Sequence, residues 1–211
     1  MPDELKPVLN RKMEIYAGFL EHTDQQLGRL VDAIDDLGAL ENTMIVYIIG
    51  DNGASAEGTP RGTFNELLVL NGVPELETTE FMVERIDQFG TLDAFNHYAV
   101  GWAHAMNTPY QWTKQVASHW GGTRNGTIIS WPNGIDDHGA IRDQFAHVID
   151  MAPTVLRAAG IPEPIIVHGF DQHPYEGFAI NDTFADPEAD EVHETQYFEM
   201  FVNRGIYHKG W

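Results

Sequence analysis

The sequence predicts an α/β fold in which a mainly parallel sheet is flanked by helices. An apolar run at 44–49, rich in β-branched residues, is typical of a strand buried on both faces in such a sheet. Upstream of it, apolar residues from Leu9 to Ile34 recur at intervals of three, four and seven, which predicts a long amphipathic helix. A helix that leads directly into a buried strand is a basic unit of α/β architecture.

The other elements follow in order along the chain. Gly38 is expected to end the long helix. Residues 54–80 are rich in Gly, Glu and Thr and predict a loop with one or two short helices, and 81–105 resume a mixed helical pattern. A second buried strand is expected at 127–131. Asp150, with Pro153 in the first turn and Gly160 at the end, predicts a helix.

A domain boundary is expected after that helix. Pro162 and Pro164 are typical of a linker. Residues 1–160 are therefore assigned to the α/β domain, and residues 161–211 to the start of a small C-terminal subdomain.

Composition restricts the classes of partner. The 211 residues are 43% hydrophobic, enough for one substantial core, and the formal charge of −20 argues against nucleic acid or an anionic membrane surface. The absence of cysteine excludes disulfides and thiolate metal sites. No apolar run of about 18 residues predicts a membrane span, and no signal peptide is evident, so the cellular location stays open.

The first predicted strand stops abruptly at Gly50-Asp51-Asn52-Gly53. Ligands of parallel sheets bind beyond the carboxyl ends of the strands, and flanking glycines let the backbone turn and approach a bound ion. Asp, Asn and Gly are also ordinary turn residues, so a simple turn is the alternative.

Several further segments follow one another in a specific order. They are 16–24 with 28–30, 50–53, 107–110, Lys114, 119–124, 129–132, 150–154 and 196–201. Through this ordered set, which extends over nearly the whole chain, the sequence resembles the sulfatase family, in particular the large bacterial arylsulfatases of the alkaline-phosphatase-like superfamily.

The resemblance implies hydrolysis of a sulfate ester substrate with a divalent cation, usually Ca²⁺, or Mg²⁺. By resemblance, Asp51 and Asn52 match metal ligands, Lys114 matches the lysine that contacts the sulfate group, and His119 lies near the pocket. Oxygen ligands suit a hard cation. Because Ca²⁺ takes about six to eight oxygens, two side chains alone predict weak affinity, roughly millimolar.

Part of the family pattern is missing. Sulfatases carry two further metal-binding aspartates and a Cys/Ser-x-Pro-x-Arg motif whose first residue becomes the formylglycine nucleophile. The nearest match here, Ser130-Trp131-Pro132-Asn133-Gly134, has glycine where arginine is expected. The resemblance therefore implies the middle and C-terminal part of a sulfatase, inactive as an isolated chain. An unpaired strand edge would favour a homo-oligomer.

Two other functions stay open: a non-catalytic self-associating module, and a related phosphodiesterase or phosphonate hydrolase. Two groups of residues raise the hypothesis of a zinc site: His97 and His104, which are seven residues apart on one expected helix face, and His168 with Asp171 and His173. Neither group has a known zinc-ligand spacing. An acidic cluster is expected to form a solvated helix face; its members are Glu75, Glu77, Glu80, Glu84 and Asp87.

Overall fold

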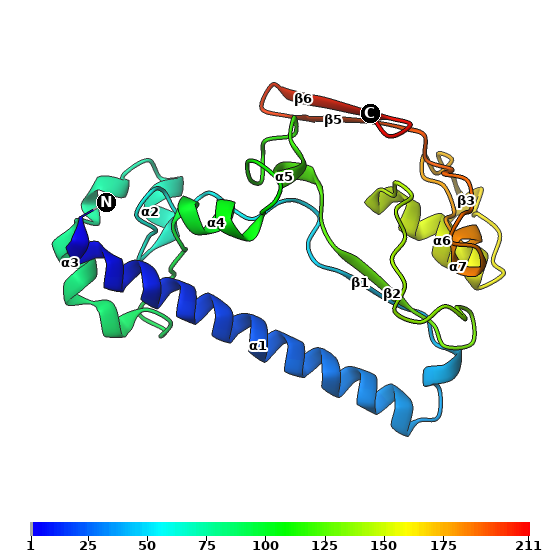
Figure 1. Ribbon diagram of the computed structural model, residues 1–211, viewed down its shortest axis with the longest axis horizontal. Coiled ribbons are helices and arrows are strands. Elements are labelled where there is room, and N and C mark those ends of the chain that lie inside the picture. Colours follow the sequence, from blue (N-terminus) through cyan, green and yellow to red (C-terminus); the bar gives the residue numbers. More distant parts are fainter. Residues whose placement is uncertain (1) are drawn as a thin grey trace.

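The computed structural model describes residues 2–211, and its largest element is the helix α1 (Lys6–Asp36), which runs along one edge of the molecule in Figure 1. The helix confirms the predicted amphipathic segment. It ends as expected before Gly38, whose φ of 65° is readily adopted only by glycine. Although α1 has 31 residues, no helix in residues 2–211 is both long and apolar enough to span a membrane.

A small hydrophobic core lies at the N-terminal end of α1. Leu5 and Val8 pack there with three side chains from the following segment, Phe64, Met82 and Phe89. The helices around this core and the neighbouring loops are α2 (Glu66–Leu70), α3 (Thr79–Glu84) and α4 (Val100–Met106). Short 3₁₀ turns occur at Asp3–Leu5, Leu40–Asn42, Pro74–Leu76, Ile86–Gln88 and Val148–Asp150.

Both predicted strands form, but they do not belong to a parallel sheet. Strand β1 (Ile45–Ile48) pairs with β2 (Thr127–Ser130) in antiparallel register. The described residues form three sheets, each a pair of antiparallel strands, so the mainly parallel sheet is a wrong prediction for this part of the molecule. The apolar run specified a strand but not the direction of its partner.

The expectation of burial on both faces of these strands is also wrong for the chain by itself. Tyr47 of β1 is 37% exposed and Ile128 of β2 is 55% exposed. Helix α1 packs chiefly at its N-terminal end, and further along it Phe19 and Leu30 are 64% and 58% exposed. The sheet and the long helix thus both present apolar surface to solvent.

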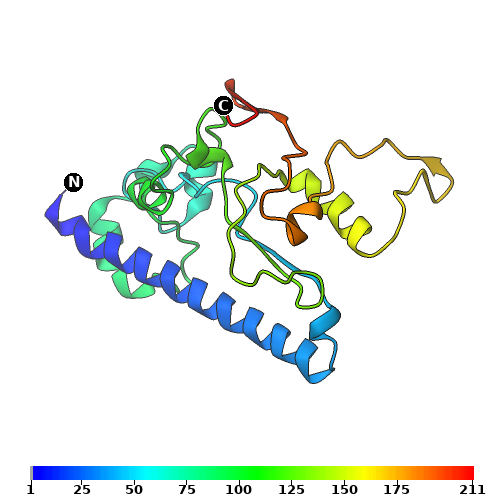
Figure 2. The ribbon, with the colours of Figure 1, turned by 45° about the vertical axis from the view of Figure 1, so that its right-hand side comes forward.

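The C-terminal part begins with α6 (Met151–Ala158), which confirms the helix predicted after Asp150. It continues through β3 (Ile166–Val167), β4 (Phe170–Asp171), α7 (Asp182–Ala185), β5 (Thr195–Met200) and β6 (Asn203–His208). Figure 2 shows the β3–β4 hairpin projecting away from the rest of the chain. The boundary near residue 160 stays a prediction.

One buried carboxylate joins α6 to the segments that follow it. Asp150 Oδ2 accepts from the His147 amide at 2.7 Å, and Oδ1 accepts from the Phe178 amide at 2.8 Å. The Nδ1 atom of buried His193 lies 2.8 Å from the same carboxylate. These contacts hold residues 161–211 against the site region described below.

Candidate functional site

The turn after β1 places Asp51 and Asn52 at the rim of a cavity. Gly50 has a φ of 86°, which allows the backbone to turn immediately after the strand. Asp51 is exposed and Asn52 is partly buried. The Asn52 side-chain amide donates to Asp51 Oδ1 at 2.6 Å, so its carbonyl oxygen and the second Asp51 oxygen remain as acceptors.

Close backbone packing fixes the end of this turn. The Gly53 amide donates to the Gly122 carbonyl at 3.0 Å, at the short helix α5 (Trp120–Thr123). A Cβ on Gly53 would collide with the Gly121 carbonyl. Gly53 therefore allows the turn to approach α5 more closely than a side chain would permit, while Gly121 and Gly122 allow α5 to pack against the carbonyls of the 111–116 loop.

Asn107 connects the same segments from a third direction. Its Oδ1 accepts from the Ala54 amide at 3.1 Å, while its Nδ2 donates to the carbonyls of Trp112 and Gly121 at 2.8 and 2.9 Å. Asn107 belonged to one of the family-like segments but was not predicted as a site residue. Its long-range backbone contacts leave no local signal in sequence.

Lys114 lies beside this turn. Its amide donates to the Ala54 carbonyl at 3.0 Å, which places the lysine next to the segment that carries Asp51. Its ammonium donates to Glu57 Oε2 at 3.0 Å, and the side chains of both residues are about one-third exposed, at 33% and 28%. This hydrogen bond is the main cause that lowers the pKa of Glu57, followed by one from Ser55.

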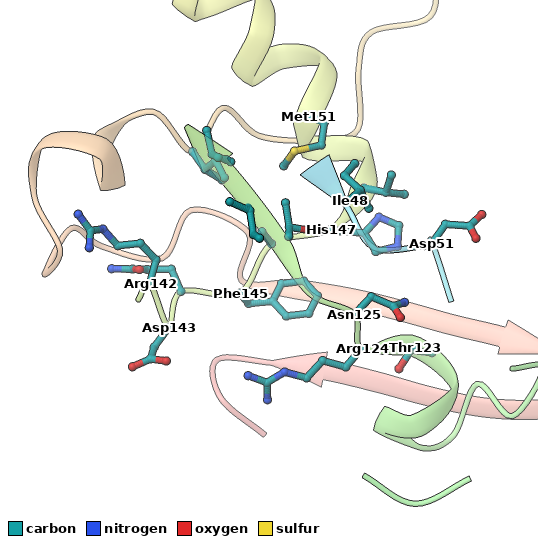
Figure 3. Close-up of a pocket in the computed structure, with 18 of the residues that line it drawn as sticks. Ile48, Asp51, Thr123, Arg124, Asn125, Arg142, Asp143, Phe145, His147 and Met151 are labelled. Carbon is teal, nitrogen blue, oxygen red and sulfur yellow. The ribbon is translucent and has the colours of Figure 1, made fainter. Parts of the chain in front are cut away.

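Asp51, Asn52 and Lys114 line one cavity of about 1200 Å³. Figure 3 shows His147 beside Ile48 and Asp51, with Arg124 and Arg142 at other points around the space. Desolvation is the largest influence on His147 and lowers its pKa, although the nearby Asp150 opposes this effect. The cavity thus combines the Asp51 carboxylate at its rim with the cationic side chains of Lys114, Arg124 and Arg142 and with His147, a composition suited to an anion held together with a cation.

His119 is placed differently. It precedes α5, is exposed, and does not line the cavity. Its Nδ1 lies 2.9 Å from the Ser118 hydroxyl, and its ring lies 5.9 Å from the Trp112 ring. The structure therefore brings together three of the four predicted residues and leaves His119 outside.

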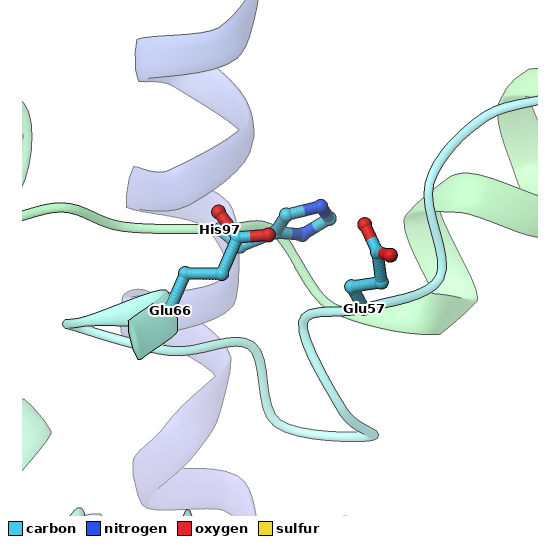
Figure 4. Close-up of side chains that lie close together, drawn as sticks. All are labelled: Glu57, Glu66 and His97. Carbon is cyan, nitrogen blue, oxygen red and sulfur yellow. The ribbon is translucent and has the colours of Figure 1, made fainter. Parts of the chain in front are cut away.

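A second cluster of potential metal ligands includes Glu57, the partner of Lys114. Glu57, Glu66 and His97 each offer one ligand atom, and these three atoms lie within 4.8 Å of one another (Figure 4). The group is already occupied by hydrogen bonds: His97 Nε2 lies 2.8 Å from the Ser55 hydroxyl, and His97 Nδ1 lies 2.8 Å from the Tyr98 carbonyl. Sequence reasoning missed this cluster because α2, α3 and their connecting segments separate Glu66 from His97 in the sequence.

Two minor predictions need correction. His97 lies before α4, in an isolated bridge with Thr63, whereas His104 lies within that helix, so the two do not share a helix face. Glu77 was expected on a solvated face but is 3% exposed. Its carboxylate accepts from the amides of Phe64 and Asn65 at 2.8 and 2.6 Å, which explains how a charged side chain can be buried there.

Comparison with known proteins identifies the family. The family model described as Sulfatase matches residues 3–161, about three-quarters of the chain. The chain belongs to the sulfatase family. All four predicted site residues lie within the region matched to sulfatases.

Two sulfatases of known sequence are similar to the chain. An uncharacterized sulfatase of Schizosaccharomyces pombe is 32% identical over 164 residues, covering 76% of this chain and 27% of that protein. An arylsulfatase of Klebsiella aerogenes is 32% identical over 152 residues, covering 71% of this chain and 30% of that protein. The chain therefore aligns with less than one-third of the length of either relative.

Proposed function

We propose that this chain supplies part of a site for sulfate ester hydrolysis, in which Asp51 and Asn52 bind Ca²⁺ or Mg²⁺ and Lys114 contacts the sulfate group. The supporting observation is that Lys114 lines the same cavity as Asp51 and Asn52, although it lies far from them in the sequence. Membership of the sulfatase family and similarity to an arylsulfatase support the same reaction class.

The chemistry of the lining fits this assignment. Asp51 and Asn52 offer hard oxygen atoms at the rim, and a divalent cation bound there would offset negative charge on a sulfate ester. The Lys114 ammonium is a compact charge with three donors, one of which is directed at Glu57, so two remain for sulfate oxygens. Arg124 adds positive charge around the same space, whereas Arg142 is paired with Asp137, which also lines the cavity.

His147 supplies a different kind of group. Because desolvation lowers its pKa below the ordinary value of 6.5, the neutral imidazole predominates at pH 7. A neutral ring can donate a hydrogen bond through one nitrogen and accept one through the other. His147 is therefore placed to orient an oxygen of the bound ester without adding another full charge.

The isolated 211-residue chain is expected to lack measurable aryl sulfate turnover. It contains no cysteine, and Ser130, the nearest match to a nucleophile motif, lies within β2 opposite Ile45. Loss of a covalent nucleophile generally leaves orders of magnitude less rate. Turnover well above a buffer blank with added Ca²⁺, lost in Asp51→Ala, would contradict this part of the proposal.

Ligand binding tests the proposed site independently of turnover. Inorganic sulfate, titrated into ¹⁵N-labelled protein in the presence of Ca²⁺, is expected to shift the amide signals of residues 51–54 and 114. Lys114→Met should abolish these shifts. The matched control is Lys209→Met, which removes a lysine from an exposed ion pair at the far end of the chain and should leave them unchanged.

The same titration separates the related alternatives. Inorganic phosphate that binds the cavity much more tightly than sulfate would favour a phosphodiesterase or phosphonate hydrolase. No shift with either anion in the wild-type chain would refute the proposed anion site.

A further inference from the structure

The carboxylate that binds the Lys114 ammonium is itself held by several hydrogen bonds. Glu57 also accepts from the Gln115 side chain at 3.1 Å and from the Ser55 hydroxyl at 2.8 Å. Three donors thus converge on one carboxylate, which fixes its orientation before any ligand arrives.

Behind Ser55, the chain of hydrogen bonds continues to His97. The ring Nε2 lies 2.8 Å from the Ser55 hydroxyl, and Nδ1 lies 2.8 Å from the Tyr98 carbonyl. The Ser55 hydroxyl donates to the Glu57 carboxylate, and its oxygen is in contact with the His97 ring, so the ring helps to fix the orientation of the hydroxyl.

The backbone around His97 is arranged to permit this contact. Gly58 lies so close to this segment that a Cβ there would meet the Tyr98 carbonyl and the His97 ring. His97 itself is fixed by a backbone bridge to Thr63. The series of bonds therefore starts at a rigid part of the chain and ends at the ammonium of Lys114.

We infer that Glu57, held by Ser55 and His97, is the positioning residue for Lys114. This inference rests on the proposed sulfate-binding role of Lys114. A long lysine side chain loses much rotamer freedom when it is fixed on a ligand. An ammonium already held by Glu57 loses less on binding, so the sulfate group would meet a preorganised donor.

The lowered pKa of Glu57 agrees with this arrangement, since the hydrogen bond from Lys114 is its largest cause. A metal ion bound by Glu57, Glu66 and His97 would compete with the hydrogen bonds that hold Lys114. The ion would need both Glu57 and His97, whose polar atoms are already engaged with Lys114, Ser55 and Tyr98.

The order of the Lys114 side chain can be measured without any ligand. The chain has four lysines, at positions 6, 12, 114 and 209, so ¹⁵Nζ ammonium spectra contain few signals, and Lys114→Arg assigns the one of interest. We expect the Lys114 signal to be visible in the wild type and in Glu57→Gln, which keeps an acceptor oxygen. In Glu57→Ala, the signal should be lost to rapid exchange with water.

Glu194→Ala provides the matched control. Lys209 lies 3.0 Å from Glu194, the same separation as in the Lys114 pair, but both side chains are more than half exposed and neither residue lines the cavity. This substitution should leave the Lys114 signal unchanged. A Lys114 signal that persists undiminished in Glu57→Ala would overturn the inference.

A reciprocal measurement covers the case in which Glu57→Ala fails to fold. In Lys114→Met, the carboxyl ¹³C signal of Glu57 should titrate at a higher pH than in the wild type, because its main stabilising hydrogen bond is gone. An unchanged Glu57 titration would also overturn the inference.

Sulfate affinity then links positioning to function. Loss of a charge-assisted hydrogen bond that orders Lys114 should weaken inorganic sulfate binding by about tenfold in Glu57→Ala, with substantial rescue in Glu57→Gln. If Glu57 only neutralised Lys114, both variants would bind sulfate more tightly, which would contradict the inference. If the wild type bound no sulfate, the proposed function would fail, while the ammonium spectra would still decide whether Glu57 orders Lys114.

Discussion

Lys12, near the N-terminal end of α1, is only 1% exposed. Its ammonium donates to the Arg61 carbonyl at 3.1 Å and lies 3.3 Å from the Met82 sulfur. Burial lowers its pKa from 10.5 to about 8, although Glu77 acts in the opposite direction. Amphipathic spacing placed this residue on α1 but gave no sign that a charged side chain would enter the core.

The lowered pKa of Lys12 predicts a pH-dependent stability. Between about pH 8 and 10 the unfolded chain binds more protons at this residue than the folded chain, so the free energy of unfolding should rise with pH by up to about 2 kcal/mol. Above pH 10 the raised pKa of Tyr98, about 12, has the opposite effect. Urea unfolding of the wild type and Lys12→Met at several pH values would measure the difference.

The variant should lack this rise, since methionine does not titrate. Lys209→Met, which changes an exposed lysine, serves as the control and should keep the wild-type slope. Equal slopes in the wild type and Lys12→Met would contradict the explanation.

At the level of elements, sequence periodicity located the helices and strands that depend on a local pattern of apolar residues. Helix α1, strands β1 and β2 and helix α6 all lie where apolar spacing and end signals predicted them. The direction of the β1–β2 pair was not predictable, because an apolar run describes the burial of a strand and not its partner.

The candidate site was predictable only in part, because some of its residues are brought together by contacts between distant parts of the sequence. Asp51 and Asn52 follow an abrupt strand end, and Lys114 was found through resemblance to a family. Asn107, Glu57 and His97 act through contacts with residues far away in sequence, which no local pattern encodes.

The contact between the β1 turn and α5 predicts a strong effect of one small substitution. Gly53→Ala would place a methyl group against the Gly121 carbonyl and should destabilise the fold by about 1–3 kcal/mol. Amide signals of residues near Lys114 should also shift, because the Lys114 amide is bonded to Ala54. Thermal unfolding and an amide spectrum would measure both effects.

Gly28→Ala is the matched control. Gly28 lies within α1, and in the described structure nothing outside the local helix backbone would lie within 4 Å of an added Cβ. Alanine should therefore be neutral or stabilising by up to about 1 kcal/mol through helix propensity. Gly53→Ala as stable as Gly28→Ala would show that the close packing is not required.

For the whole molecule, the main physical feature is uncovered apolar surface. Phe19 and Leu30 on α1 and Ile128 on β2 are all more than half exposed. Surfaces of this kind favour association, and a two-stranded sheet leaves edges that can pair with another chain. We expect the 23.7 kDa chain to form a homo-oligomer through the sheet or α1, and not through its acidic surface.

Light scattering at micromolar concentration would measure the mass in solution. Replacing Phe19 and Leu30 together by glutamine should shift the protein towards the monomer if α1 forms the interface. A monodisperse wild-type monomer would refute the prediction of self-association.

The most direct test of the sulfate site is the coupling between its two ligands. If Asp51 and Asn52 hold Ca²⁺ in the cavity that Lys114 lines, the cation and the anion must each change the affinity of the other. Isothermal titration with inorganic sulfate should therefore show tighter binding in the presence of Ca²⁺ than in its absence, and Asp51→Ala should remove the difference. Sulfate affinity that is the same with and without saturating Ca²⁺ in the wild-type chain would contradict the proposed site.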